Sequence, residues 1–414
     1  MMKDIIFLIN LFFIIFIFQS TVHAQSEALA RLWGVNDDAL PTMLETERNL
    51  KKVDGILNRV INNSDFGGTW IDVKANKVFI NTLSTANVSY ITSLPGVHPY
   101  VDLLNFTIID NSTDKLSDSF EQIIKLAKKY IAVDVYLYVD ISLNNIVIYL
   151  EQSKSDPKNS EFINATDQYY PILIYQPPDP PTTKQQSTMK LYNNDKRQID
   201  KVLLCGEGIY RGSRTEIDYS CSIGFFAKLA NNSDVTYAVT TGHCYTDRGS
   251  NIFYYFPWGD RPDGTLLGVM DIHRVEDYDY GLIGLKRRGI RPLPMIRNTD
   301  ANEYKQLQIR DTKPVSNHGA HLCKSGHTTH ATCEYIKAFD GIFIDSESFA
   351  TELIINDMEG DIGDSGGAAY YYYENLYSVN LSGIHTGGNK GIGSILPLQI
   401  ILDETKIVPI LVNE

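Results

Sequence analysis

The sequence predicts an all-β domain in its second half, built as two small barrels side by side and preceded by a smaller α+β unit. Short β-prone segments, broken by glycine, aspartate and proline, follow one another over residues 203–414. Such segments are typical of a sandwich or of barrels. The residues before them mix helix and strand patterns. A chain of 414 residues is also too long for one ordinary core, so two or more folding units are expected.

The chain begins with a sequence typical of a secretory signal peptide. Lys3 precedes an apolar run over residues 5–18, and small and polar residues follow as far as Ala24. This order predicts removal of residues 1–24 and export from the cell. An uncleaved membrane anchor is the alternative, although the apolar run is shorter than a bilayer span. No later segment of the sequence is apolar for long enough to cross a membrane, so we expect a secreted, extracellular protein.

Residues 25–150 contain no cysteine and are expected to form the α+β unit. Alternating apolar and polar residues predict one hairpin around residues 75–76 and a second around residues 144–145. Between the hairpins, a helix is predicted to begin at one of three N-cap candidates, Ser117, Asp118 and Ser119. Its apolar face would consist of Phe120, Ile123, Ile124, Ala127 and Tyr130.

Proline and polar residues dominate residues 151–202. This composition predicts an exposed linker and processing region rather than part of a core. Lys196 and Arg197 form a dibasic pair in this stretch, and exposed linkers are preferred sites of proteolysis. A solvated charge pair is the alternative. The β domain would then begin at residue 203.

The cysteines are confined to the last domain. Export favours disulfides among them, and their odd number leaves one cysteine over. They are Cys205, Cys221, Cys244, Cys323 and Cys333.

N-x-S/T sequons occur along much of the chain. They would be glycan acceptors in a eukaryotic host, although such sequons also arise by chance in an asparagine-rich sequence. They begin at Asn62, Asn87, Asn105, Asn111, Asn164, Asn231 and Asn380. The formal net charge of −13 and the lack of clustered Lys and Arg argue against a nucleic-acid partner.

Three segments of the last domain carry side chains suited to nucleophilic catalysis. His243 ends the apolar segment "AVTTGHC", Asp279 precedes "YGLIGL", and Ser365 lies in "GDSGG". A serine hydroxyl attacks efficiently when a neutral imidazole takes its proton, and a buried carboxylate orients that imidazole. Glycines beside the serine admit unusual backbone angles, so the N–H groups of Gly363 and Ser365 could hold an oxyanion. Each piece alone has a structural alternative, but the three together favour a catalytic triad.

These segments resemble the chymotrypsin-like serine peptidases, and within them the bacterial-type branch of streptogrisins and α-lytic endopeptidase. The matching stretches are "YSCSIGF", "VTTGHC", "DYDYGLI", "LCKSGHTTHATC", "GDSGG" and "GIHTGG". "FGGTWIDVKANKVFI" is similar to the pro-region of the same branch. The resemblance implies a double six-stranded barrel, with residues 25–150 as a pro-region that assists folding and blocks the site until it is removed.

The resemblance also assigns roles to individual residues. His243 would be the general base, Asp279 its orienting carboxylate and Ser365 the nucleophile. Lys324 would form a buried ion pair with Asp364, so that activation need not insert a new N-terminus into the domain. Two disulfides are implied, Cys221–Cys244 and Cys323–Cys333. Protein or peptide substrates, no cofactor or metal, and a monomer are expected.

The sequence departs from this branch near the serine. "INDMEGDIGDSGG" and "GGNKGIGSI" lack the cysteines of a further disulfide that is common there, so the walls of the substrate pocket are less constrained. Cys205 has no evident partner and would be free or bonded outside the chain. A zinc cluster is an alternative for the histidine-rich stretch, although its spacing is not that of a standard finger. Its ligands would be His321, Cys323, His327, His330 and Cys333.

Substrate preference depends on a short stretch near the C-terminus. Glutamate-preferring relatives carry a histidine at the position of His385, and an imidazolium there could balance a substrate carboxylate. Glu359 and Asp361 could instead favour a basic residue, and an apolar preference also stays open. We expect an acidic residue before the cut. The residues expected to bind substrate are His385, Thr386, Gly387 and Gly388, of which the two glycines would pair with substrate backbone.

Two other classes of protein are compatible with the same sequence. A peptidase fold without catalysis could serve binding or adhesion, although the intact triad disfavours this. A secreted β-protein with a glycosylated stalk is the other alternative.

Overall fold

The computed structural model describes residues 27–176 and 201–412, apart from residues 215, 260, 263, 287, 288, 347 and 390. The expected signal peptide, residues 1–24, and the dibasic pair Lys196 and Arg197 lie outside the described residues. None of the helices within these ranges is both long and apolar enough to span a bilayer.

The N-terminal unit contains both hairpins that the sequence predicts. Their turns place Asn76 and Asn144 at φ 51° and φ 48°, left-handed conformations that asparagine tolerates. The first hairpin belongs to a three-stranded sheet of order β1-β2-β3. The elements are α2 (Ala28–Trp33), α3 (Leu40–Leu57), β1 (Phe66–Asp72), β2 (Lys77–Thr82), α4 (Thr85–Ser93), β3 (Leu104–Ile108), α5 (Thr113–Lys129), β4 (Val135–Asp140) and β5 (Asn145–Leu150).

Helix α5 begins five to seven residues earlier than predicted. Its N-cap is Ser112, whose hydroxyl accepts a hydrogen bond from the backbone N–H of Lys115 at 3.2 Å. The additional residues bury Leu116 beside the predicted core residues Ile123 and Ala127. Ser112 therefore supplies the capping oxygen that the sequence analysis assigned to residues 117–119.

The predicted linker also begins too early in the sequence analysis. Residues 151–176 are folded, and they contain α6 (Ser160–Thr166) and β6 (Ile172–Tyr175). Phe162 is 1% exposed, and β6 pairs in parallel with β5. The proline-rich residues that dominate the composition lie after residue 176. Their composition outweighed, in the sequence analysis, the few apolar side chains that join residues 151–176 to the N-terminal unit.

The C-terminal half consists of two β units, as predicted. The first is an eight-stranded antiparallel sheet of order β23-β10-β11-β14-β13-β12-β8-β9. Its strands are β8 (Gly208–Gly212), β9 (Ile217–Ser222), β10 (Phe225–Leu229), β11 (Asn232–Thr240), β12 (Ile252–Phe256), β13 (Leu266–Arg274), β14 (Tyr280–Leu285) and β23 (Ile407–Pro409).

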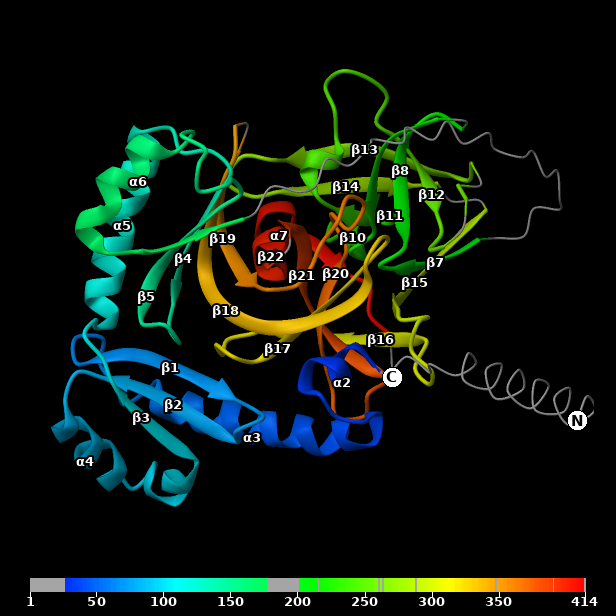
Figure 1. Ribbon diagram of the computed structural model, residues 1–414. Coiled ribbons are helices and arrows are strands. Elements are labelled where there is room, and N and C mark those ends of the chain that lie inside the picture. Colours follow the sequence, from blue (N-terminus) through cyan, green and yellow to red (C-terminus); the bar gives the residue numbers. More distant parts are fainter. Residues whose placement is uncertain are drawn as a thin grey trace, which may run out of the picture.

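The second unit is a closed antiparallel barrel of six strands, which pair in the circular order β17-β18-β19-β22-β21-β20. These strands are β17 (His321–Gly326), β18 (His330–Ile344), β19 (Phe349–Asn356), β20 (Ala368–Tyr372), β21 (Ser378–Asn389) and β22 (Ile392–Pro397). Further strands, β7 (Lys201–Cys205), β15 (Ile290–Arg297) and β16 (Gln306–Asp311), extend its sheet. Helix α7 (Leu398–Thr405) then leads back to the first unit (Figure 1).

The N-terminal unit docks on the second barrel through a shared sheet. Strand β4 pairs antiparallel with β18, so that Leu137 lies opposite Ile342. Figure 1 shows β4 and β5 beside the outer end of β18, and α2 beneath β17 and β18. The sheet of the barrel is therefore continuous with the hairpin β4–β5.

Buried carboxylates fix the helices of the N-terminal unit to the same barrel. Glu47 accepts hydrogen bonds from the backbone N–H of His321 at 2.7 Å and from its Nδ1 at 2.8 Å. Burial alone would raise the pKa of Glu47, but His321 and Lys51 lower it to about 2. Asp54 accepts from Asn317 at 2.7 Å in the same interface. These hydrogen bonds join helix α3 to residues that are 263 and 274 positions later in the sequence.

Burial decides the expectations about two single residues. Cys205 is fully buried and free, which is the first of the two states that the sequence left open, and burial raises the pKa of its thiol. Asn380 lies on β21 and is 1% exposed, which leaves no room for a glycan.

Candidate active site

His243 and Asp279 meet at the end of two neighbouring strands. β11 and β14 pair antiparallel, with Thr240 opposite Gly281. His243 follows β11 in a short 3-10 turn, and Asp279 immediately precedes β14. The imidazole Nδ1 therefore lies 2.6 Å from Asp279 Oδ2, and the backbone N–H of His243 donates to Asp279 Oδ1 at 3.0 Å. The sequence analysis paired the same two residues.

The carboxylate controls the protonation of this imidazole. Burial alone would lower the pKa of His243, but the charge and the hydrogen bond of Asp279 raise it above its ordinary value of 6.5. The His243 side chain is 28% exposed, while that of Asp279 is 10% exposed. With Nδ1 held by Asp279, the Nε2 atom has no hydrogen-bond partner in the described part of the chain and can exchange a proton with a substrate.

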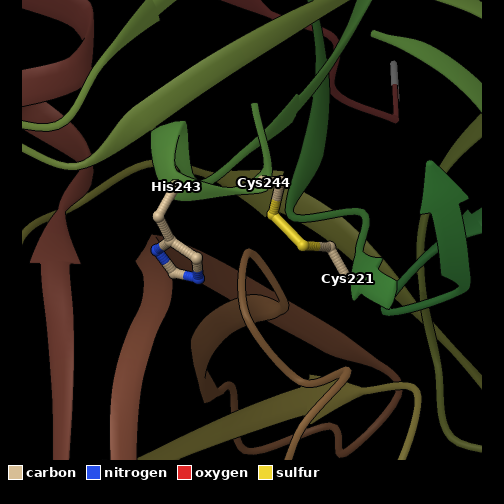
Figure 2. Close-up of side chains that lie close together, drawn as sticks. All are labelled: Cys221, His243 and Cys244. Atoms are coloured by element: carbon tan, nitrogen blue, oxygen red, sulfur yellow. A yellow bond between two sulfur atoms is a disulfide. The ribbon is translucent and has the colours of Figure 1, made fainter. Parts of the chain in front are cut away.

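A disulfide connects the histidine to the turn of residues 361–367 that carries Ser365, the serine turn. Cys244 follows His243 and is bonded to Cys221 of β9 (Figure 2). Ser222, the next residue, donates its backbone N–H to the carbonyl of Ser365 at 2.7 Å. Cys221, His243 and Cys244 lie close enough together to suggest a metal site, but the disulfide leaves neither cysteine as a thiolate that could bind the ion.

In the serine turn, the carbonyl groups of residues 362–365 are all engaged. The hydroxyl of Thr328 donates to the carbonyl of Ile362 at 2.6 Å, and that of Ser222 to the carbonyl of Gly363 at 2.7 Å. Two backbone N–H groups satisfy the remaining carbonyls: Gly367 donates to Asp364 at 2.9 Å and Ser222 to Ser365 at 2.7 Å.

The N–H groups of the same turn are not all engaged. Those of Asp364 and Gly366 donate to backbone carbonyls. Those of Gly363 and Ser365 find no acceptor among the residues that the structure describes. Gly363 has a φ of 106°, a conformation that favours glycine. Buried backbone donors are rarely left unpaired, so this pair of N–H groups has the chemistry of an oxyanion-binding site.

Ser365 itself is partly exposed, between the buried residues Asp364 and Gly366. No hydrogen bond joins its hydroxyl to His243 or to any other group that the structure describes. The Cys221–Cys244 disulfide thus holds the His243–Asp279 pair near the serine turn. The hydrogen bond between Ser365 and His243 that would complete the predicted triad is not formed in the structure. Such bonds are often long or poorly aligned without substrate.

The predicted ion pair between Lys324 and Asp364 holds the serine turn through a buried contact. Lys324 Nζ lies 3.2 Å from Asp364 Oδ2, and both side chains are completely buried. Thr329 donates its hydroxyl to Asp364 Oδ2 at 2.6 Å. Burial alone would raise the pKa of Asp364, but Lys324 and Thr329 lower it to about 2. Asp364 therefore stays charged, and its bonds hold the turn in place.

The zinc alternative for the histidine-rich stretch is contradicted. Cys323 and Cys333 form a disulfide between β17 and β18, as the family resemblance implies. His321 is bonded to Glu47, and His330 is bonded through Nδ1 to Asp300 at 2.6 Å. Four of the five proposed ligands are therefore engaged in separate interactions, and His327 alone cannot hold a zinc ion.

The expected substrate-binding residues lie at the end of β21, but His385 is not charged there. It is 2% exposed, and burial, followed by the charge of Lys324, lowers its pKa to about 3. The imidazolium considered in the sequence analysis is therefore absent from the free protein. Glu359 and Asp361 are both exposed, and Asp361 Oδ1 accepts a hydrogen bond from the N–H of Ile362 at 2.7 Å.

Strand β4 of the N-terminal unit reaches the same region. The hydroxyl of Tyr136 lies 3.5 Å from the position that a Cβ on Gly387 would take, and Tyr136 is 2% exposed. Thr386, beside Gly387, shares a hydrogen bond with Ser394 at 2.9 Å. The N-terminal unit therefore covers part of the wall that the sequence analysis assigned to substrate.

Two residues of the site were missed in the sequence analysis. Ser222 and Thr328 hold carbonyls of the serine turn, and although both lie in stretches that match the family, the sequence analysis gave neither a role. Their positions, directly after Cys221 and four residues after Lys324, are the available signal.

No protein-family model and no curated protein matches the chain. Several solved structures are similar to about half of it. Thermobifida fusca protease A has 19% identity, a TM-score of 0.41, and coverage of 51% of this chain and 100% of that one. Cellulomonas bogoriensis chymotrypsin has 21% identity, a TM-score of 0.39, and coverage of 51% and 100%. A glutamic acid-specific serine protease that uses a histidine triad in substrate binding has 21% identity, a TM-score of 0.40, and coverage of 50% and 100%.

Proposed function

We propose that this chain is the precursor of a secreted serine endopeptidase. His243 is the general base, Asp279 orients it and Ser365 is the nucleophile. The N–H groups of Gly363 and Ser365 bind the oxyanion. One observation carries the proposal: around a single disulfide, an imidazole held by a carboxylate meets a serine turn with two unengaged N–H groups.

The reaction follows from these positions. His243 Nε2 takes the hydroxyl proton while Ser365 Oγ attacks the peptide carbonyl, whose oxygen becomes an anion held by the two N–H groups. The protonated His243 then gives its proton to the leaving amine as the C–N bond breaks. Water then attacks the resulting ester while His243 takes one of its protons. The bond between the acyl carbon and Ser365 Oγ breaks as the protonated His243 returns that proton to Oγ, which releases the acid and restores the Ser365 hydroxyl.

The N-terminal unit would be the inhibitor and folding partner of the barrel. The pairing of β4 with β18, the buried Glu47–His321 contact and the position of Tyr136 against Gly387 support this role. Cleavage of the chain after residue 176 and dissociation of the N-terminal unit would expose the expected substrate-binding residues 385–388. We propose export through the signal peptide, followed by release of the peptidase as a monomer.

We also propose a preference for an acidic residue before the cut. His385 is neutral in the free protein because burial lowers its pKa. A substrate carboxylate beside it would raise that pKa, since an opposite charge favours the charged imidazole. Binding would then take up a proton. A peptide-library cleavage profile without preference for Glu or Asp would contradict this part of the proposal.

A catalytically silent binding protein is the second candidate. The missing hydrogen bond between Ser365 and His243 is the observation that favours it. The two candidates differ in casein hydrolysis by protein secreted from the full-length chain. We expect hydrolysis by the wild type and none by a Ser365→Ala variant, whereas equal activity of the two, or none from either, would favour the silent protein.

The protonation of His243 predicts a pH dependence. The general base must be neutral, and Asp279 raises the pKa of His243 above 6.5. The rate constant kcat/KM should therefore rise with pH through a midpoint above 6.5 and fall as His243 becomes protonated below it. Initial rates of casein hydrolysis between pH 5 and 9 test this, and a midpoint below 6 would contradict the assignment.

A further inference from the structure

The orientation of one peptide group decides whether the oxyanion site exists. The N–H of Gly363 belongs to the peptide that joins it to Ile362. In a trans peptide the C=O and the N–H point in opposite directions. The group that holds the Ile362 carbonyl therefore also sets the direction of the Gly363 N–H.

We propose that Thr328 is a positioning residue for catalysis, because its hydroxyl holds this peptide with the Gly363 N–H directed at the oxyanion. The inference rests on the proposed function. Thr328 Oγ1 donates to the Ile362 carbonyl at 2.6 Å. The same oxygen lies 2.5 Å from the position that a Cβ on Gly363 would take, so the hydroxyl is packed directly against this peptide.

The threonine is itself held in place. Its backbone N–H donates to Asp364 Oδ1 at 2.8 Å, and Thr329, the next residue, donates to the same oxygen at 3.1 Å. Since Asp364 is buried with Lys324, the turn between β17 and β18 is bound to the serine turn at a fixed distance. These bonds therefore fix the position of the Thr328 hydroxyl beside the Ile362 carbonyl.

The neighbouring peptides have other supports. The N–H of Ile362 donates to Asp361 Oδ1 at 2.7 Å. The carbonyl of Gly363 accepts from Ser222 Oγ at 2.7 Å, and that hydroxyl in turn accepts from the N–H of His327 at 2.8 Å. In the described part of the chain, the Ile362–Gly363 peptide is held by Thr328 alone. It is the one plane of the turn that a single side chain controls.

The same peptide is free to rotate if that support is lost. Gly363 has no Cβ to restrict the change in backbone angles, and the Ile362 side chain is 75% exposed, so packing does not hold it. Rotation of the plane would place the Ile362 carbonyl where the oxyanion forms. A carbonyl oxygen there repels the developing charge instead of stabilising it.

The test compares Thr328→Val, which keeps the shape and removes the hydroxyl, with Thr328→Ser, which keeps the hydroxyl. Both are secreted from the full-length chain. For Thr328→Val we expect a loss of kcat on casein of about 10- to 100-fold, at or below the lower end of the roughly 10²–10³-fold effect of removing an oxyanion donor outright, because the donor is misdirected rather than removed. KM and the thermal midpoint should be unchanged. Inactivation by a fluorophosphonate probe should slow by the same factor. The Thr328→Ser variant should retain most of the wild-type kcat and most of the wild-type rate of inactivation by the probe.

Unchanged rates in Thr328→Val would overturn the proposal, and so would a rise in KM alone. Equal losses in the valine and serine variants would also overturn it, because they would point to the methyl group. If wild-type protein does not react with the probe, the proposed function fails. Crystal structures then decide the inference separately: it requires a rotated Ile362–Gly363 peptide in Thr328→Val and falls if the plane is unchanged.

Discussion

An Asp279→Asn variant should lose about 10⁴-fold in kcat, the effect seen when the orienting carboxylate of a triad becomes an amide. The amide nitrogen would donate toward His243 Nδ1, which now lies 2.6 Å from a carboxylate oxygen. The imidazole would then carry its proton on Nε2 and could not accept one from Ser365. The pKa of His243 should also fall, because burial would act without the attraction of Asp279.

The measurement is the initial rate on casein across the pH range, with Asp277→Asn as the matched control. Asp277 lies two residues earlier in the same loop, is 52% exposed, and pairs with Arg274 at 2.7 Å. It should retain wild-type activity. Similar losses in both variants would mean that the loop, rather than the carboxylate, governs the rate.

Replacing Lys324 with methionine should destabilise the folded protein by about 3–5 kcal/mol, the usual effect of removing one partner of a buried ion pair. Asp364 would stay buried, without a counter-ion, in the turn that carries Ser365. Activity should fall with it, because the same carboxylate accepts hydrogen bonds that position Thr328 and Thr329.

The loss should depend on pH in a defined direction. The pKa of Asp364 is lowered from 3.8 to about 2, so its charge contributes stability above pH 3.8, and this is lost as pH falls through about 2. In Lys324→Met the attraction that lowers the pKa of Asp364 is gone and burial raises it instead, so the carboxyl is protonated at a higher pH than in the wild type. The deficit should therefore be largest near neutral pH and should shrink toward pH 4. Denaturant unfolding at pH 7 and pH 4 measures this difference.

Two further variants separate the ion pair from general effects of losing a lysine. Lys337→Met breaks a partly exposed pair with Asp357 at 2.7 Å and should cost much less. Adding Asp364→Asn to Lys324→Met should recover part of the stability, because the unpaired charge is gone. Equal losses for Lys324→Met and Lys337→Met, without recovery in the double variant, would contradict the account.

Local patterns predicted much of the fold and the main elements of the site. The hairpins at Asn76 and Asn144 were predictable because the alternation of apolar and polar residues that indicates them is a property of neighbouring residues in the sequence. The pairing of His243 with Asp279 followed from chemistry that needs both groups, and antiparallel pairing of β11 with β14 brings them together. The fold of residues 151–176 was missed because three apolar residues of β6 are outweighed by the proline-rich residues that follow.

Contacts between a side chain and a distant backbone group were beyond sequence analysis. Ser222 and Thr328 bind carbonyls 141 and 34 residues away, and any serine or threonine has the same donor. The contact between Glu47 and His321 spans 274 residues. Burial of His385 had the same difficulty, because it depends on strands that surround β21 only after folding. These contacts decide pKa values and peptide orientations, so substrate preference was the weakest part of the prediction.

The most direct test is covalent labelling of Ser365. Protein secreted from the full-length chain is treated with a fluorophosphonate probe, digested and analysed by mass spectrometry. The account predicts one modified peptide, containing residues 359–370, with the phosphonyl group on Ser365 and no labelling in Ser365→Ala. Absence of label in the wild type, or label that persists in Ser365→Ala, would contradict the claim that this serine is the nucleophile.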